Sequence, residues 1–106
     1  MSIADKGKID AIALSEDGTE IVLMIADHIK WKDEYRHLML LQDKINTYIT
    51  YWENKQYNDI YHNNIIDHGV IEIHFKYSPS TKCKDFLEVA KAQLLRAKLY
   101  IRYYVD

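Results

Sequence analysis

The sequence predicts a small α+β domain, a two-layer β-β-α-β-α sandwich in which two helices cover one face of a mainly antiparallel sheet. Runs that alternate in hydrophobicity lie on both sides of a segment whose apolar residues recur with the helical period. The chain has 106 residues, of which 48% are hydrophobic, with only three glycines and one proline. We therefore expect a single domain, residues 1–106, with a core of its own.

Residues 8–29 predict a β-hairpin, because two β-favourable runs flank the turn-forming pair Asp17-Gly18. One face of these strands is apolar, as expected for a face that packs on a core. The opposite face is not polar, because it carries Ala11, Ala13, Val22 and Met24. A sheet with one solvated face usually alternates more cleanly, so we expect something to cover part of this second face.

From about Glu34 to Glu53 the apolar residues follow the helical period and form one stripe: Leu38, Leu41, Ile45, Tyr48, Ile49 and Trp52. Asp33 is the expected N-cap, because its carboxylate can accept hydrogen bonds from the amides of the first turn. Trp31 precedes this cap and can pack back on the first turns as a hydrophobic staple. Asn54 is the expected stop.

An irregular connection is expected next, followed by a half-buried strand in "GVIEIHFKYS" and a final helix that begins at Ser80 or Thr81 and runs to near the chain end. A right-handed crossover through the first helix makes this third strand parallel to the second. We expect it to lie beside the first strand, in the sheet order 2-1-3.

The final helix is predicted to carry two apolar stripes. Its core face comprises Cys83, Phe86, Leu87, Ala90, Leu94, Ala97 and Ile101. A second stripe on the opposite side comprises Ala92, Leu95, Leu99 and Tyr103. The second stripe either packs inside the domain, meets another chain or, as a third alternative, lies on a membrane surface. We take these four residues as candidate interface residues, together with Leu40 and Tyr51.

The charge balance gives no reason to expect nucleic acid or a membrane as a partner. The chain has 14 basic and 16 acidic residues and a formal charge of -2. Such a balance produces no long-range field towards polyanions. With one cysteine no intramolecular disulfide is possible, and the first ten residues contain no apolar run. We therefore expect a cytoplasmic protein without an export signal.

The side chains form no recognisable catalytic or metal-binding set. Glu34 and His37 have the Glu-x-x-His spacing of di-iron bundles, but that architecture needs a second such motif, and the second helix has no histidine. Zinc-ligand spacings and phosphate loops are absent. Cys83 falls on the core face and is expected to be buried and inert. We therefore expect no metal, no cofactor and no enzymatic activity.

The sequence also resembles a known family. Asp27, Trp31, Asp33 and Glu34 match a "D-x-x-x-W-x-D-E" motif. A second motif, "HLxLLQ-x-KIN-x-Y", is matched by His37, Leu38, Leu40, Leu41, Gln42, Lys44, Ile45, Asn46 and Tyr48. With these motifs, roughly the first half of the chain resembles an uncharacterised family of small bacterial proteins, a domain of unknown function. The resemblance implies a bacterial origin and a small domain, and it brings no activity or cofactor.

These observations favour a non-catalytic protein-interaction module. We expect it to self-associate, most simply as a homodimer, or to bind another protein, for example as an immunity-type protein that neutralises a toxin. The alternative is a small enzyme or metal-dependent protein that uses His37 and Glu34, with His28 or His74. Clustered tyrosines near the end of the first helix support the interaction hypothesis.

Overall fold

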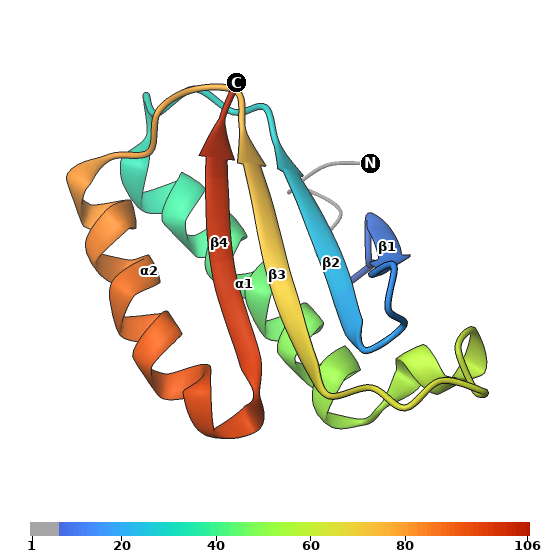
Figure 1. Ribbon diagram of the computed structural model, residues 1–106. Helices are drawn as coiled ribbons and strands as arrows, with labels where there is room; N and C mark the ends of the chain where they lie inside the picture. Colours follow the sequence, from blue (N-terminus) through green and yellow to red (C-terminus); the bar gives the residue numbers. More distant parts are fainter. Residues whose placement is uncertain (1–6) are drawn as a thin grey trace.

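The computed structural model describes residues 7–106 (Figure 1). Part of the segment predicted to lack an export signal lies outside these residues. The elements are, in chain order, β1 (Ala11–Leu14), β2 (Glu20–Asp27), α1 (Glu34–Glu53), the 3₁₀ turn η1 (Gln56–Asp59), β3 (His68–Phe75), α2 (Thr81–Leu94), the 3₁₀ turn η2 (Leu95–Ala97) and β4 (Leu99–Val105).

The α+β class is confirmed, but the predicted sheet is wrong in two respects. The four strands lie in the order β1-β2-β3-β4, so β3 pairs with β2 and not with β1. Only β1 and β2 are antiparallel, whereas β2 with β3 and β3 with β4 are parallel. The physical reason is length: β2 and β3 each have eight residues, whereas β1 has four and would leave half of the β3 backbone groups without partners.

The predicted final helix is also wrong beyond its fourth turn. α2 ends at Leu94, Lys98 adopts a left-handed conformation with φ 56°, and the chain then returns along β3 as β4. The sequence of β4, "LYIRYYV", consists mostly of aromatic and branched apolar residues, which favour strands over helices. The two-stripe helix of the sequence analysis is therefore a helix followed by an edge strand.

Both helices pack on one face of the sheet, as predicted. Parallel crossovers are right-handed in nearly all proteins, and two that step in the same direction place their helices on the same side. In Figure 1, α1 lies behind the sheet and α2 lies beside β4. The core between these layers comprises Ile21, Leu23, Ile25, Leu41, Ile45, Tyr48, Trp52, Tyr57, Ile71, Ile73, Phe75, Cys83, Leu87, Leu99 and Ile101. No helix within residues 7–106 is long and apolar enough to span a bilayer.

The predicted turn and caps are confirmed. Gly18 has φ 75° in the hairpin turn, a conformation that glycine adopts without a steric penalty. The Asp33 side chain accepts a hydrogen bond from the Arg36 amide at the start of α1, and Ser80 accepts one from the Cys83 amide at the start of α2. Asn54 is the C-cap of α1.

Gly69 of β3 tests how tightly the helix layer packs on the sheet. A Cβ at this position would lie 2.8 Å from the Trp52 ring and 3.2 Å from Leu99 Cδ1. We expect Gly69→Ala to lower the free energy of unfolding by about 1–3 kcal/mol, the usual cost of overpacking. Urea denaturation measures this change.

Gly7→Ala is the matched control, because a Cβ at Gly7 meets nothing within 4 Å. Equal free energies of unfolding for the two variants would show that the Trp52 ring leaves room for a methyl group at position 69.

Candidate functional site

A buried polar cluster lies at the carboxyl end of β2. His37 Nε2 is 2.6 Å from Asp27 Oδ2, and the two side chains are 1% and 0% exposed. The Trp31 ring stacks on the His37 ring with centroids 3.5 Å apart, which confirms the predicted staple. The Ile29 amide donates to the second Asp27 oxygen. The cluster therefore ties the last residue of β2 and the following loop to the first turn of α1.

A surface hollow of about 530 Å³ lies beside this cluster. Its lining comprises Ile29, Lys30, Lys32, Asp33, Arg36, His37 and Leu40. Trp31 Nε1 and His37 Nδ1 are buried and have no hydrogen-bond partner in the described structure. Glu34 points elsewhere, because its carboxylate lies 3.9 Å from Lys82 Nζ on α2. The structure thus does not bring Glu34 and His37 together as a ligand pair.

No group of three or more metal-ligating side chains occurs within residues 7–106. The predicted burial of Cys83 is confirmed, since this thiol is fully buried. Burial, together with the negative charges of Asp27 and Glu34, raises the pKa of Cys83 to about 12. Its thiolate is therefore scarcely populated at neutral pH, which agrees with the prediction of an inert residue.

A second buried polar cluster joins the segment before β1 to α1. Lys44 Nζ is fully buried and donates to Asp10 Oδ1 and to the Lys8 carbonyl oxygen, both at 2.7 Å. The Tyr48 hydroxyl accepts from the Asp10 amide and donates to the Met24 carbonyl oxygen. These contacts hold the segment that precedes β1 against α1 and β2, which is a structural role.

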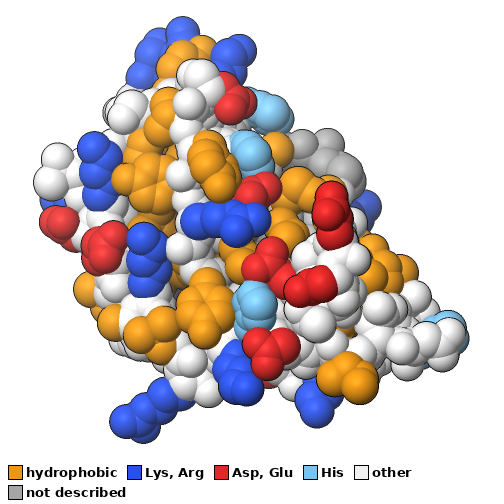
Figure 2. All heavy atoms as spheres, viewed as in Figure 1, with side chains coloured by type: hydrophobic (Ala, Val, Ile, Leu, Met, Phe, Trp, Pro, Cys, Tyr) orange, Lys and Arg blue, Asp and Glu red, His pale blue; other side chains and the backbone are white. Residues whose placement is uncertain are grey.

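The face of the sheet opposite the helices carries a different set of side chains, in three rows across the strands. The rows follow the strand register: Val22, Val70 and Tyr100; Met24, Glu72 and Arg102; and Ala26, His74 and Tyr104. No described element covers these rows, and Figure 2 shows hydrophobic side chains on this face around a centre of acidic, basic and histidine side chains. We call these nine residues the open face. Val22 is nevertheless only 9% exposed and Met24 is half-buried, so the cover predicted for part of this face stays a prediction.

Ion pairs and ring contacts fix the larger side chains of the open face. Arg102 Nε donates to Glu72 Oε1 at 2.9 Å, and His74 Nε2 lies 2.9 Å from Glu72 Oε2. Burial works to raise the pKa of Glu72, but hydrogen bonds from His74 and Arg102 outweigh it and hold the pKa below its usual value. The Tyr104 ring stacks on His74 with centroids 5.5 Å apart.

Beside the open face, His68 lies between two carboxylates. Its Nδ1 is 3.0 Å from Asp67 and its Nε2 is 2.7 Å from Glu20. Hydrogen bonds to Asp67 and Glu20 raise the pKa of His68, against the smaller opposing effect of burial. The Tyr100 ring meets the His68 ring edge-on, with centroids 5.6 Å apart.

The six predicted interface residues do not form one surface. Leu99 is fully buried in the core, and Tyr103 is half-buried against the Phe75 ring. Ala92 and Leu95 are exposed, at the end of α2 and in η2. Leu40 and Tyr51 lie half-buried on α1, about three turns apart. Sequence reasoning missed Tyr100, Arg102 and Tyr104 because it placed them on a helix.

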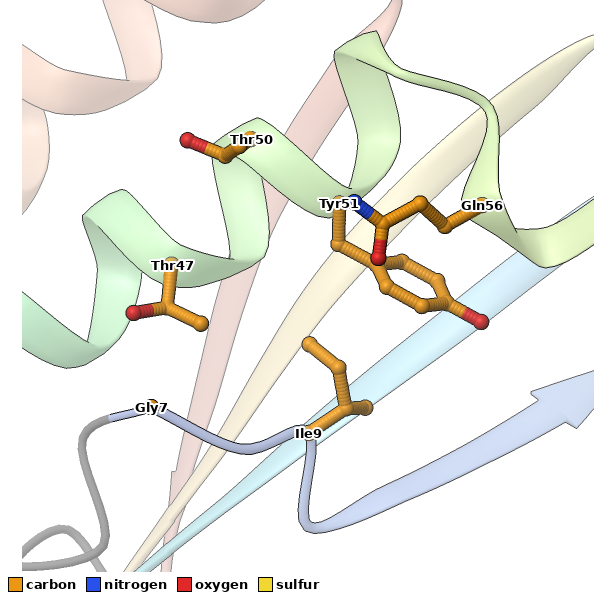
Figure 3. Close-up of a pocket in the computed structure, with 6 residues that line it drawn as sticks. All are labelled: Gly7, Ile9, Thr47, Thr50, Tyr51 and Gln56. Atoms are coloured by element: carbon orange, nitrogen blue, oxygen red, sulfur yellow. The ribbon is translucent and has the colours of Figure 1, made fainter.

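Tyr51 borders a separate hollow of about 300 Å³ between α1 and the segment before β1. Its other lining residues are Gly7, Ile9, Thr47, Thr50 and Gln56. Figure 3 shows the Tyr51 ring above Ile9, with Gln56 beside it. The hollow is shallow and contains no charged side chain, so it lacks the convergent polar groups of a catalytic site.

The Asp27–His37 pair makes a stability prediction. His37→Leu leaves the Asp27 carboxylate buried with only the Ile29 amide as a partner, and we expect a loss of about 2–4 kcal/mol in the free energy of unfolding. His28→Leu, at an exposed position of the same loop, should change it by less than about 0.5 kcal/mol. Chemical denaturation of both variants measures the difference, and equal values would contradict a stabilising pair.

The environment of His68 makes a pH prediction. Its pKa is raised in the folded state, so its stabilising contribution is complete below the unfolded value of about 6.5 and is lost as the pH rises through the folded value. The stability difference between wild type and His68→Gln should be largest near about pH 5.5, at no more than about 1 kcal/mol, and smaller near about pH 9. A difference independent of pH in urea denaturation would refute this assignment.

A family model covers residues 1–106, the whole chain and not only the predicted first half, and its description is a family of unknown function, DUF6572. Searches of curated proteins and of solved structures each found no match. The chain therefore belongs to this family of unknown function.

Proposed function

We propose that this protein is a non-catalytic protein-interaction module that binds its partner with the open face. The observation that carries the proposal is a sheet face that no described helix covers and that nevertheless presents ordered aromatic side chains. Tyr100 and Tyr104 are 42% and 48% exposed. Exposed apolar and aromatic area of this kind is typical of binding surfaces.

The composition of the open face supports the proposal. Tyrosine and arginine are enriched among the residues that dominate binding energy, and both occur here on neighbouring positions of β4. Val22 and Val70 lie beside them on the same face but are only 9% and 4% exposed, so the contact area comes chiefly from the tyrosine and arginine side chains. Charged groups accompany these side chains as a paired set, so a partner need not bury an isolated charge.

Pre-organisation supports it further. Tyr100 is braced by His68, Tyr104 is stacked on His74, and Arg102 is held by Glu72. Side chains that are ordered before binding lose less conformational entropy on binding, which leaves more of the contact energy as affinity. The open face therefore has the physical properties of a prepared contact surface.

The enzymatic alternative has less support from the geometry. His37 lies under the Trp31 ring and is engaged with Asp27, whereas Glu34 engages Lys82. A general base must reach the proton that it abstracts, and here the free nitrogen of His37 is buried. The cluster is better explained as a connection between β2 and α1.

An immunity-type protein is the specific form of the proposal that we favour. Such a protein needs only a rigid surface that occludes a toxin, and it needs no catalytic group. Self-association, the other form expected from the sequence, would use the β4 edge of the sheet.

The open face can be tested by truncating its exposed rings. In Tyr100→Ala/Tyr104→Ala, we expect at least a tenfold loss of affinity, about 1.4 kcal/mol, for a partner encoded by a neighbouring gene. Tyr35→Ala is the matched control, since Tyr35 is 76% exposed on α1 and should bind like wild type. Calorimetry or co-purification measures binding. Equal affinity of the double variant and the control would refute the open face as the binding surface.

A further inference from the structure

β4 forms a free edge of the sheet. It pairs with β3 on one side, where Lys98 O accepts from the Gly69 amide and the Asp106 amide donates to Phe75 O. In a parallel ladder, alternate residues direct both backbone groups to the same neighbour. The even-numbered residues of β4 therefore face β3, and the odd-numbered residues direct their N–H and C=O groups away from the sheet: Leu99, Ile101, Tyr103 and Val105.

This edge lacks the usual protection against further strand pairing. Natural edge strands are short, bulged, or carry lysine or proline. β4 has seven residues, pairs one-to-one with β3, and contains no lysine, proline or glycine. Its one charge, Arg102, points to the open face and is paired with Glu72. The opposite edge, β1, has only four residues.

Within residues 7–106, the outward amides of Ile101, Tyr103 and Val105 take part in none of the hydrogen bonds of turns, loops and caps. Leu99 is fully buried and Ile101 is only 5% exposed, so the outward backbone donors and acceptors at the surface are chiefly those of Tyr103 and Val105, at the carboxyl end of β4. Such groups are satisfied most directly by another strand, which adds hydrogen bonds without any change in the sheet.

We infer that the free edge of β4 pairs antiparallel with β4 of a second copy, which joins two sheets of four strands across a two-fold axis. The position of Arg102, the one charged residue of β4, favours β4 of a second copy as the partner strand. Outward residues must face outward residues, which leaves three central registers. Two of them place Arg102 opposite Tyr100 or Tyr104 of the second copy, and one places it opposite Arg102.

The register that places Arg102 opposite Tyr104 is the favoured one, because it is centred on Tyr103 and leaves the buried Leu99 outside the pairing. A guanidinium opposite a tyrosine ring gains a cation–π contact, whereas like charges directly opposite one another destabilise a strand pair. On the helix side the same register places only apolar or aromatic residues of β4 opposite one another. The side chains of β4 are therefore complementary to those of β4 in a second copy on both faces of the joined sheet.

α2 provides an independent observation that supports the same axis. A two-fold axis normal to the sheet keeps the helices of both copies on one face and brings the two α2 helices next to each other. Ala92 and Leu95 are exposed at the end of α2, next to the start of β4, and Leu95 is 56% exposed. Both residues belong to the interface set predicted from the sequence, but in the inferred dimer most of the contact is made by β4.

This inference goes beyond the proposed function, because its hydrogen bonds are made by the edge of β4, although the Arg102–Tyr104 contact across the axis also uses two residues of the open face. In the paired sheet both open faces lie on the same side, so the dimer presents two binding surfaces together. The two proposals can fail separately, because Tyr103→Pro removes only an edge amide and leaves the Tyr100 and Tyr104 rings of the open face, and dimer formation does not require a partner.

Tyr103→Pro tests the pairing. Proline removes an N–H that points away from β3, so it leaves the internal ladder intact. Tyr103→Ala is the matched control, because it loses the same ring but keeps the N–H. By light scattering over a range of concentrations, wild type and Tyr103→Ala should reach twice the chain mass of 12.6 kDa, whereas Tyr103→Pro should stay at 12.6 kDa. A monomeric wild type, or a dimer that Tyr103→Pro leaves intact, would overturn the inference.

Amide hydrogen exchange of the wild type gives a second test that does not depend on the folding of a variant. The outward amides of Tyr103 and Val105 should be protected at high protein concentration and exposed on dilution. The amides of Arg102 and Tyr104 should be protected throughout, because they donate to β3. Outward amides whose exchange does not change with concentration would also overturn the inference.

Discussion

The rest of the structure depends on one constraint of connection geometry. The crossovers from β2 to β3 and from β3 to β4 are both parallel and step in the same direction, so their helices lie on the same side of the sheet. The core faces of both helices are then buried on that side, and the described chain has no further helix for the other. As a result, no described helix covers the open face, and β4 is left as a free edge. These are the two surfaces through which we propose that the protein binds.

The residues of the two sequence motifs stabilise this arrangement of helix and sheet. Asp27, Trp31 and His37 meet in one buried cluster, and Lys44 and Tyr48 meet Asp10 in another. Buried polar groups tolerate few alternative arrangements, because each must keep its partner. The two clusters therefore fix where α1 begins and how it lies on the hairpin. Their role is structural, while the residues of the open face lie on β2, β3 and β4, outside these motifs.

Elements with one clear periodicity could be predicted from the sequence. α1 was predictable because its stripe, N-cap and stop all agree, and the hairpin turn because Gly18 needs a positive φ. β4 could not be, because Leu95, Leu99 and Tyr103 are spaced by four, which fits both a helix and a strand. No glycine or asparagine marks the helix end, since Lys98 itself adopts the left-handed conformation. The open face could not be predicted either, because its rows form only when β4 pairs in parallel with β3.

The central claim is that the helices close one face of the sheet and leave the other uncovered. Tyrosine nitration followed by mass spectrometry, on dilute protein without a partner, tests it directly. The account predicts that Tyr100 and Tyr104 react at rates comparable to Tyr35, which is 76% exposed, whereas Tyr48 of the core stays unmodified. Protection of Tyr100 and Tyr104 to the level of Tyr48 would show that the open face is covered within the chain and would contradict the account.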